Sequence, residues 1–77
     1  MHEHITNEIN KLAEGQLICL LKAESIRTHL VSMGPIESPE CLETMLVGHN
    51  EMKALWLKHK NCQAGIDALN KIKSKLP

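Results

Sequence analysis

The sequence has almost no aromatic side chains: its 77 residues include one Trp, no Phe and no Tyr. Aromatic and β-branched residues favour strands, and the few β-branched residues here are scattered singly, without sustained period-two alternation. This composition argues against a strand-rich fold. A core built from Leu, Ile, Met, Cys and Ala instead favours helices packed side by side.

Neither sign of charge is in excess. Nine Lys and Arg balance nine Asp and Glu, so the formal net charge is zero. A generic electrostatic attraction to nucleic acid or to an anionic membrane is therefore not expected, and little long-range repulsion opposes self-association. No segment approaches the roughly 20 apolar residues that a membrane span needs. The polar first residues lack the apolar run of a signal peptide.

Cysteines are few, odd in number and far apart. Cys19, Cys41 and Cys62 each fall within a helix-like segment, which does not resemble a disulfide framework. We expect reduced thiols, packed as small apolar residues in a cytoplasmic protein. The five His form no metal-binding motif with these Cys, so no metal and no cofactor are expected. Without a base placed beside a thiol or a Gly-rich phosphate loop, an enzyme is not expected either.

What the sequence does contain is two heptad-patterned stretches, separated by a break with Gly34 and Pro35. Apolar or small residues recur at alternating steps of three and four, which keeps one face toward a neighbouring helix. The chain is expected to form one all-α domain, an antiparallel helical hairpin with helices at about 5–33 and 39–75 and a turn at about 34–38. The residues that carry the pattern are Ile5, Ile9, Leu12, Cys19, Ala23, Ile26, Leu30 and Met33, then Cys41, Met45, Met52, Leu55, Cys62, Ile66, Leu69 and Leu76.

Local signals mark the turn more clearly than the start of the chain. Gly34 can adopt positive φ just past the first helix, and Pro35 cannot continue that helix. Ser38 is a favourable N-cap for the second helix, and Pro39 suits its first position. The first helix is expected to begin at a cap on Thr6 or its neighbour Asn7, with the residues before it frayed.

The position of the turn also predicts which residues face each other. A chain folded about residues 35–37 pairs positions whose numbers sum to about 72. The expected neighbours are Cys19 with Met52, Cys62 with Ile9, and His59 with Leu12.

Each helix carries an apolar stripe that is too wide for one neighbouring helix to cover, on the order of half of its circumference. A homodimer, forming a four-helix bundle or a coiled-coil-like assembly, would cover the remainder. Docking on a different protein is the alternative. Gln16 lies within the stripe and is the candidate residue for setting register. The candidate residues for self-association or partner binding are Leu17, Leu20, Leu21, Met45, Met52 and Trp56.

These features predict a small non-enzymatic interaction protein, a homodimer that modulates a larger cytoplasmic partner as an inhibitor or adaptor. A phage or prophage would be a typical setting. One alternative is a nucleic-acid-binding regulator, whose hairpin-dimer architecture would resemble that of the plasmid copy-number protein Rop in shape alone. The lysines of the second half project at scattered angles, which counts against that alternative. A second alternative is a small subunit that is stable only in a hetero-complex.

Overall fold

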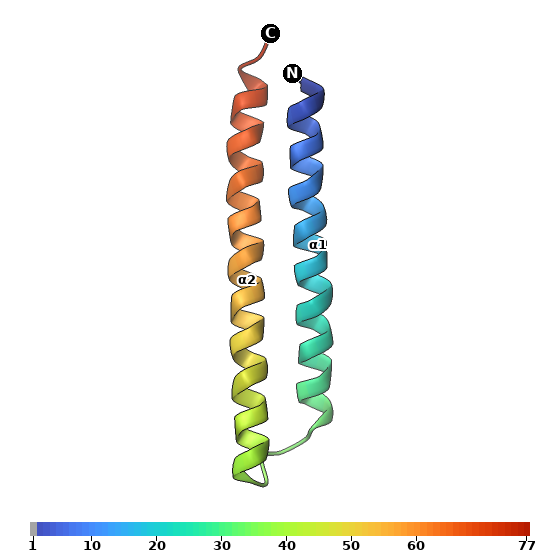
Figure 1. Cartoon of the computed structure of the whole chain (residues 1–77), viewed down its shortest axis with the longest axis vertical. Helices are drawn as coiled ribbons and strands as arrows, with labels where there is room; N and C mark the ends of the chain where they lie inside the picture. The colour runs from blue at the N-terminus through green and yellow to red at the C-terminus, as the bar shows by residue number, and fades with distance from the viewer. Residues whose placement is uncertain (1) are drawn as a thin grey trace.

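The computed structural model describes residues 2–77, which form two long antiparallel helices (Figure 1). Helix α1 spans His2–Ser32, and helix α2 spans Pro39–Ser74. The molecule is a rod that measures 61 × 14 × 12 Å. No strand occurs among the described residues. The predicted all-α helical hairpin is confirmed.

The connection between the helices is defined by a glycine and a cap. Gly34 has φ of 74°, a left-handed conformation that side-chain-bearing residues rarely adopt. Its N–H donates to the carbonyl oxygen of Val31 at 3.3 Å, which closes the end of α1. Ser38 caps α2, because its Oγ accepts a hydrogen bond from the N–H of Cys41 at 3.1 Å, and Pro39 occupies the first turn.

The start of α1 differs from the prediction. The helix begins at His2, so neither Thr6 nor Asn7 is its cap. Ile5 is buried, with 6% of its surface exposed, and the Oγ1 of Thr6 accepts a hydrogen bond from Nζ of Lys73 at 3.1 Å. The hydroxyl thus contacts the neighbouring helix instead of capping its own. Packing against α2 extends the helical conformation beyond the point that the local capping signal indicated.

Two glycines of α2 fix the register of the hairpin. A Cβ at Gly48 would lie 2.9 Å from Cδ2 of Leu30, and a Cβ at Gly65 would lie 3.0 Å from Cδ1 of Leu12. Each leucine therefore packs directly over a glycine of the opposite helix, where a larger residue would force it to move. Facing positions sum to about 78 along the hairpin, so the heptad positions of the two helices meet layer by layer.

This register corrects the predicted pairing. Cys62 lies beside Gly15, since a Cβ there would be 3.6 Å from Sγ of Cys62, and it is not near Ile9. His59 lies across from Gln16, whose Nε2 donates to the His59 carbonyl oxygen at 3.3 Å. It is therefore about two turns of α1 away from its predicted neighbour, Leu12. The predicted sum was too low by about six residues.

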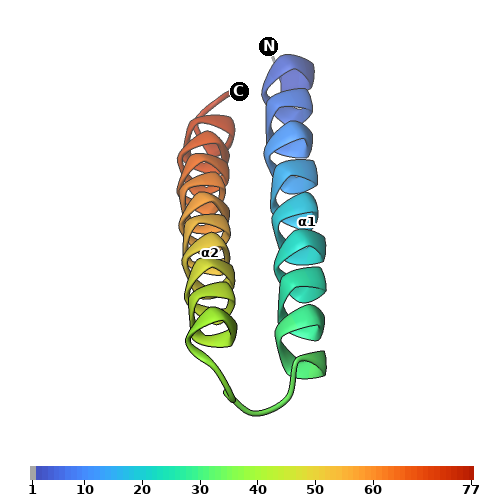
Figure 2. The ribbon, with the colours of Figure 1, turned by 60° about the horizontal axis from the view of Figure 1, so that its bottom comes forward.

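The reason for the error is that the turn does not reverse the chain symmetrically. In the observed register Ser32 is level with Leu46, so the first residues of α2 extend about two turns beyond the end of α1 (Figure 1). The connection spans this offset as an open loop, which Figure 2 shows from a second direction. As a further consequence, Cys19 shares a layer with His59 and not with Met52.

The core is a single narrow line of side chains between the helices, which we call the seam. Its most buried members expose 8% of their surface or less, and most other heptad positions are only half-buried. No large side chain among the described residues is completely buried. The buried apolar residues are Ile5, Cys19, Ala23 and Leu30.

The glycines of the seam should respond differently to a methyl group. Gly15→Ala should raise the free energy of unfolding by about 1 kcal/mol, because alanine favours helix and the nearest Cys62 atom leaves ordinary room. Gly48→Ala should lower it by about 1 kcal/mol, because three atoms of Leu30 stand within 3.2 Å of the new carbon. Urea denaturation followed by far-UV circular dichroism measures both. Equal stabilisation by the two substitutions would contradict this packing.

Candidate protein-interaction surface

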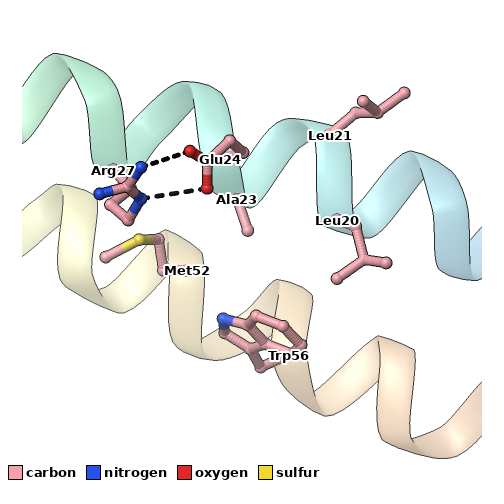
Figure 3. Close-up of a pocket in the computed structure, with 7 residues that line it drawn as sticks. All are labelled: Leu20, Leu21, Ala23, Glu24, Arg27, Met52 and Trp56. Carbon is pink, nitrogen blue, oxygen red and sulfur yellow. Dashed lines mark hydrogen bonds and ion pairs between the residues drawn. The ribbon is translucent and has the colours of Figure 1, made fainter.

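One side of the hairpin carries a shallow apolar groove between the two helices (Figure 3). On α1 the side chain of Leu20 points toward α2, whereas Leu21 points away from it. On α2 the groove is bounded by Trp56 and by Met52 of the seam. The complete lining is Leu20, Leu21, Ala23, Glu24, Arg27, Met52 and Trp56.

The apolar character continues along the same side of both helices. Residues one heptad apart share a helix face, so Leu17 and Val31 flank Glu24 on α1. On α2, Leu42 lies two heptads before Trp56 and shares its face, with the exposed His49 between them, and Leu46 is one turn after Leu42. We call these residues together the lateral surface: Leu17, Leu20, Leu21, Glu24, Arg27 and Val31 of α1, with Leu42, Leu46 and Trp56 of α2. The apolar residues of the lateral surface are all more than a third exposed.

Trp56 is the largest side chain of the lateral surface, and 51% of it is exposed. Its ring packs edge-to-face on the imidazole of His59, with the centroids 5.4 Å apart and the planes at 62°. His59 is half-buried in the seam, so one edge of the indole packs against the hairpin while about half of the side chain faces solvent. A half-exposed Trp is typical of the residues that dominate protein–protein interfaces.

A single ion pair crosses the lateral surface. Arg27 donates from Nε to Oε2 of Glu24 at 3.0 Å and from its terminal nitrogen to the second carboxylate oxygen. This hydrogen bonding holds the pKa of Glu24 below its ordinary value and raises the pKa of Arg27. The two side chains therefore stay ionised near neutral pH and form a bidentate pair in the middle of the apolar side chains.

The opposite side of the hairpin carries charged side chains beside exposed apolar ones such as Ile18. A shallow depression there is lined by Lys22, Glu51 and Lys58 together with Ala54 and Leu55. Lysines of the second half are thus divided between different faces: Lys58 lies on this charged side, while Lys73 is hydrogen-bonded to α1. These two lysines therefore do not share one basic face.

Gln16 is the polar member of the seam. Its Nε2 donates to Oε1 of Gln63 at 2.9 Å and to the carbonyl oxygen of His59 at 3.3 Å, so it joins α1 to α2 near the middle of the rod. Gln63 in turn donates to Oδ1 of Asp67 at 2.9 Å. This network extends along α2 from the inter-helix contact.

The structure separates the six predicted interaction residues into two groups. Leu17, Leu20, Leu21 and Trp56 are exposed on the outer surface, whereas Met45 and Met52 are half-buried in the seam. Sequence reasoning did not single out the remaining members of the lateral surface. Heptad spacing from Leu17, Leu20 and Trp56, together with the step of four from Leu42 to Leu46, is the signal that could have found them. The missed residues are Glu24, Arg27, Val31, Leu42 and Leu46.

The thiols and histidines do not form a candidate metal site in the part of the chain that the structure describes. Cys19 is buried, and Cys41 and Cys62 are half-buried; all three are free thiols. Within residues 2–77 no three His, Cys, Asp or Glu side chains come together in a way that could hold a metal ion. Neither α1 nor α2 includes a stretch apolar and long enough to cross a bilayer.

Comparison with protein-family models, with curated proteins and with solved structures finds no match to this chain. Its interpretation therefore depends on the hairpin and its lateral surface.

Replacing Gln16 tests its predicted role in setting register. Gln16→Leu should raise the free energy of unfolding by about 1 kcal/mol, because an apolar side chain replaces a polar one in the seam. It should also allow more than one helix register, which would appear as more than one amide peak per residue in an NMR correlation spectrum. Gln63→Ala is the control and should keep one set of peaks. A single set for Gln16→Leu would exclude Gln16 as the register determinant.

Proposed function

We propose that this chain is a small non-enzymatic interaction protein, which works as a homodimer and modulates a larger cytoplasmic protein as an inhibitor or adaptor. The lateral surface would be the self-association surface. The outer faces of the resulting bundle would then be presented to the larger partner. Free thiols and a seam without disulfides are compatible with a reducing compartment.

The main support for the proposal is that the hairpin exposes more surface than a compact monomer of the same mass. The hairpin exposes 5877 Å², whereas a compact monomer of this mass exposes about 4,700 Å². Its radius of gyration is 17.5 Å, against about 11.5 Å for a compact domain of this length. The excess, about 1,200 Å², exceeds the roughly 800 Å² that each partner buries in a standard protein–protein interface.

The side chains available on the lateral surface also suit binding better than catalysis. The groove offers leucines, a half-exposed Trp and one ion pair whose members already satisfy each other. A catalytic site needs a nucleophile or base that can act on a substrate, and the groove residues include no such free group. Its shape and chemistry instead resemble the apolar faces on which amphipathic helices pack.

Adjacent residues of α1 provide a matched test of the proposal. Leu17 lies on the lateral surface and Ile18 on the other side of the helix; they are 57% and 52% exposed. The wild-type protein should sediment as a dimer at micromolar concentration. Leu17→Glu should weaken dimerisation at least about tenfold, because it buries an unpaired carboxylate in the interface.

Ile18→Glu, with the same added charge one residue away, should leave the dimer unchanged. Sedimentation equilibrium over a wide concentration range measures both variants, and circular dichroism checks that each remains helical. A folded wild-type monomer at all concentrations would refute the homodimer and leave the lateral surface free for a different protein.

A further inference from the structure

We infer that the second copy covers the lateral surface in an antiparallel arrangement, with α1 packed on α1 and Glu24 of each copy opposite Arg27 of the other. The inference rests on the proposed homodimer and specifies its geometry. Two intrachain ion pairs thereby become one group of four alternating charges at the centre of the interface. The two-fold axis crosses the hairpin at right angles to its length, between Glu24 and Arg27.

The positions of Glu24 and Arg27 allow each of them to meet the other residue in a second copy. Glu24 and Arg27 are one turn apart on the same side of α1, and they bind each other. A two-fold axis between them pairs residues of the two α1 helices whose numbers sum to 51. Glu24 then meets Arg27, and Arg27 meets Glu24. A charged pair that would be costly in an apolar interface is matched by its own symmetry copy.

Apolar side chains of the lateral surface lie on both sides of the ion pair along the rod, and this rotation exchanges the two sides. In the observed register of the hairpin, one group of lateral residues lies on the open-end side of the ion pair and another lies toward the loop. The rotation places each group over the other, for example Leu20 over Val31. The open-end group is Leu17, Leu20, Leu21 and Trp56; the loop-end group is Val31, Leu42 and Leu46.

The area agrees with a second copy as the occupant. From the exposed fractions of its seven apolar residues, which range from 39% to 68%, the lateral surface offers on the order of 700 Å² of surface to be buried per chain, close to the roughly 800 Å² per partner of a standard interface. The complex would contain four helices of similar length around a shared apolar centre, which is a four-helix bundle.

The parallel arrangement of the same two surfaces is disfavoured by the same charges. A parallel dimer that also packs α1 on α1, about a two-fold axis running along the rod, would set Glu24 opposite Glu24 and Arg27 opposite Arg27. Like charges facing each other in a partly dry interface repel, and each would also lose water. The ion pair therefore favours the antiparallel orientation, in which Glu24 and Arg27 can also be buried in the interface with opposite charges beside them.

A doubly substituted chain tests the orientation directly. The variant E24R/R27E keeps an ion pair with the same spacing, the same composition and the same net charge, so it should dimerise with itself as the wild type does. Mixed with the wild type in an antiparallel dimer, it sets Glu opposite Glu and Arg opposite Arg. In a parallel dimer the mixed species would instead pair opposite charges.

The experiment mixes equal amounts of wild type and ¹⁵N-labelled E24R/R27E, allows exchange to reach equilibrium, and counts dimers by native mass spectrometry. We expect the mixed dimer to fall at least about threefold below its statistical share at low salt and to approach that share at 1 M salt, where the Debye length is about 3 Å. The control variant E51K/K58E, on the charged opposite side, should mix statistically with the wild type.

Each other outcome refutes a specific part of the inference. An excess of mixed dimer would show the parallel arrangement, and statistical mixing of E24R/R27E would show that the charges do not face each other. Both results would leave the homodimer itself intact. Wild-type chains that stay monomeric under these conditions would overturn the homodimer together with its geometry.

Discussion

The constraint on which this structure depends is that two helices can share only one line of contact. A helix pair buries one stripe of each member, and any apolar residue outside that stripe stays in water unless another molecule covers it. Among residues 2–77 the seam buries its four most enclosed apolar residues to 8% exposure or less, while twelve large apolar side chains remain exposed. The hairpin therefore leaves much of its apolar surface uncovered, and the lateral surface is a direct consequence.

Within the seam, the two helices lie close together and are not held apart by large side chains. A core with a single Trp and no Phe or Tyr lacks large side chains to fill a wide gap between helices. Leu12 and Leu30 instead pack onto Gly65 and Gly48, which leaves the helix backbones close together at these layers. Glycine weakens an isolated helix by about 1 kcal/mol relative to alanine. Here that loss is offset by contacts that only one register permits.

The sequence was sufficient for the helices and the turn, and insufficient for the way in which they are paired. Heptad spacing and the capping residue Ser38 each act within a few residues, so they can be read locally. Register depends on contacts between leucines and glycines that are far apart in the chain, such as Leu12 and Gly65, and the turn alone did not determine it. The same holds for the lateral surface: its leucines were recognisable from periodicity, but the placement of Glu24 and Arg27 beside Trp56 required the paired helices.

The open end of the hairpin brings the first and last described residues together, since Nε2 of His2 lies 3.3 Å from the carbonyl oxygen of Pro77. This proximity determines how the molecule would resist mechanical force. A load applied between these two points acts across the seam and opens one layer at a time, beginning near Ile5, so the helices unzip at low force. A load applied along the rod, from the loop to the open end, is instead carried along the covalent length of a helix and does not pull the two helices apart. The molecule therefore resists force weakly in one direction and strongly in the other.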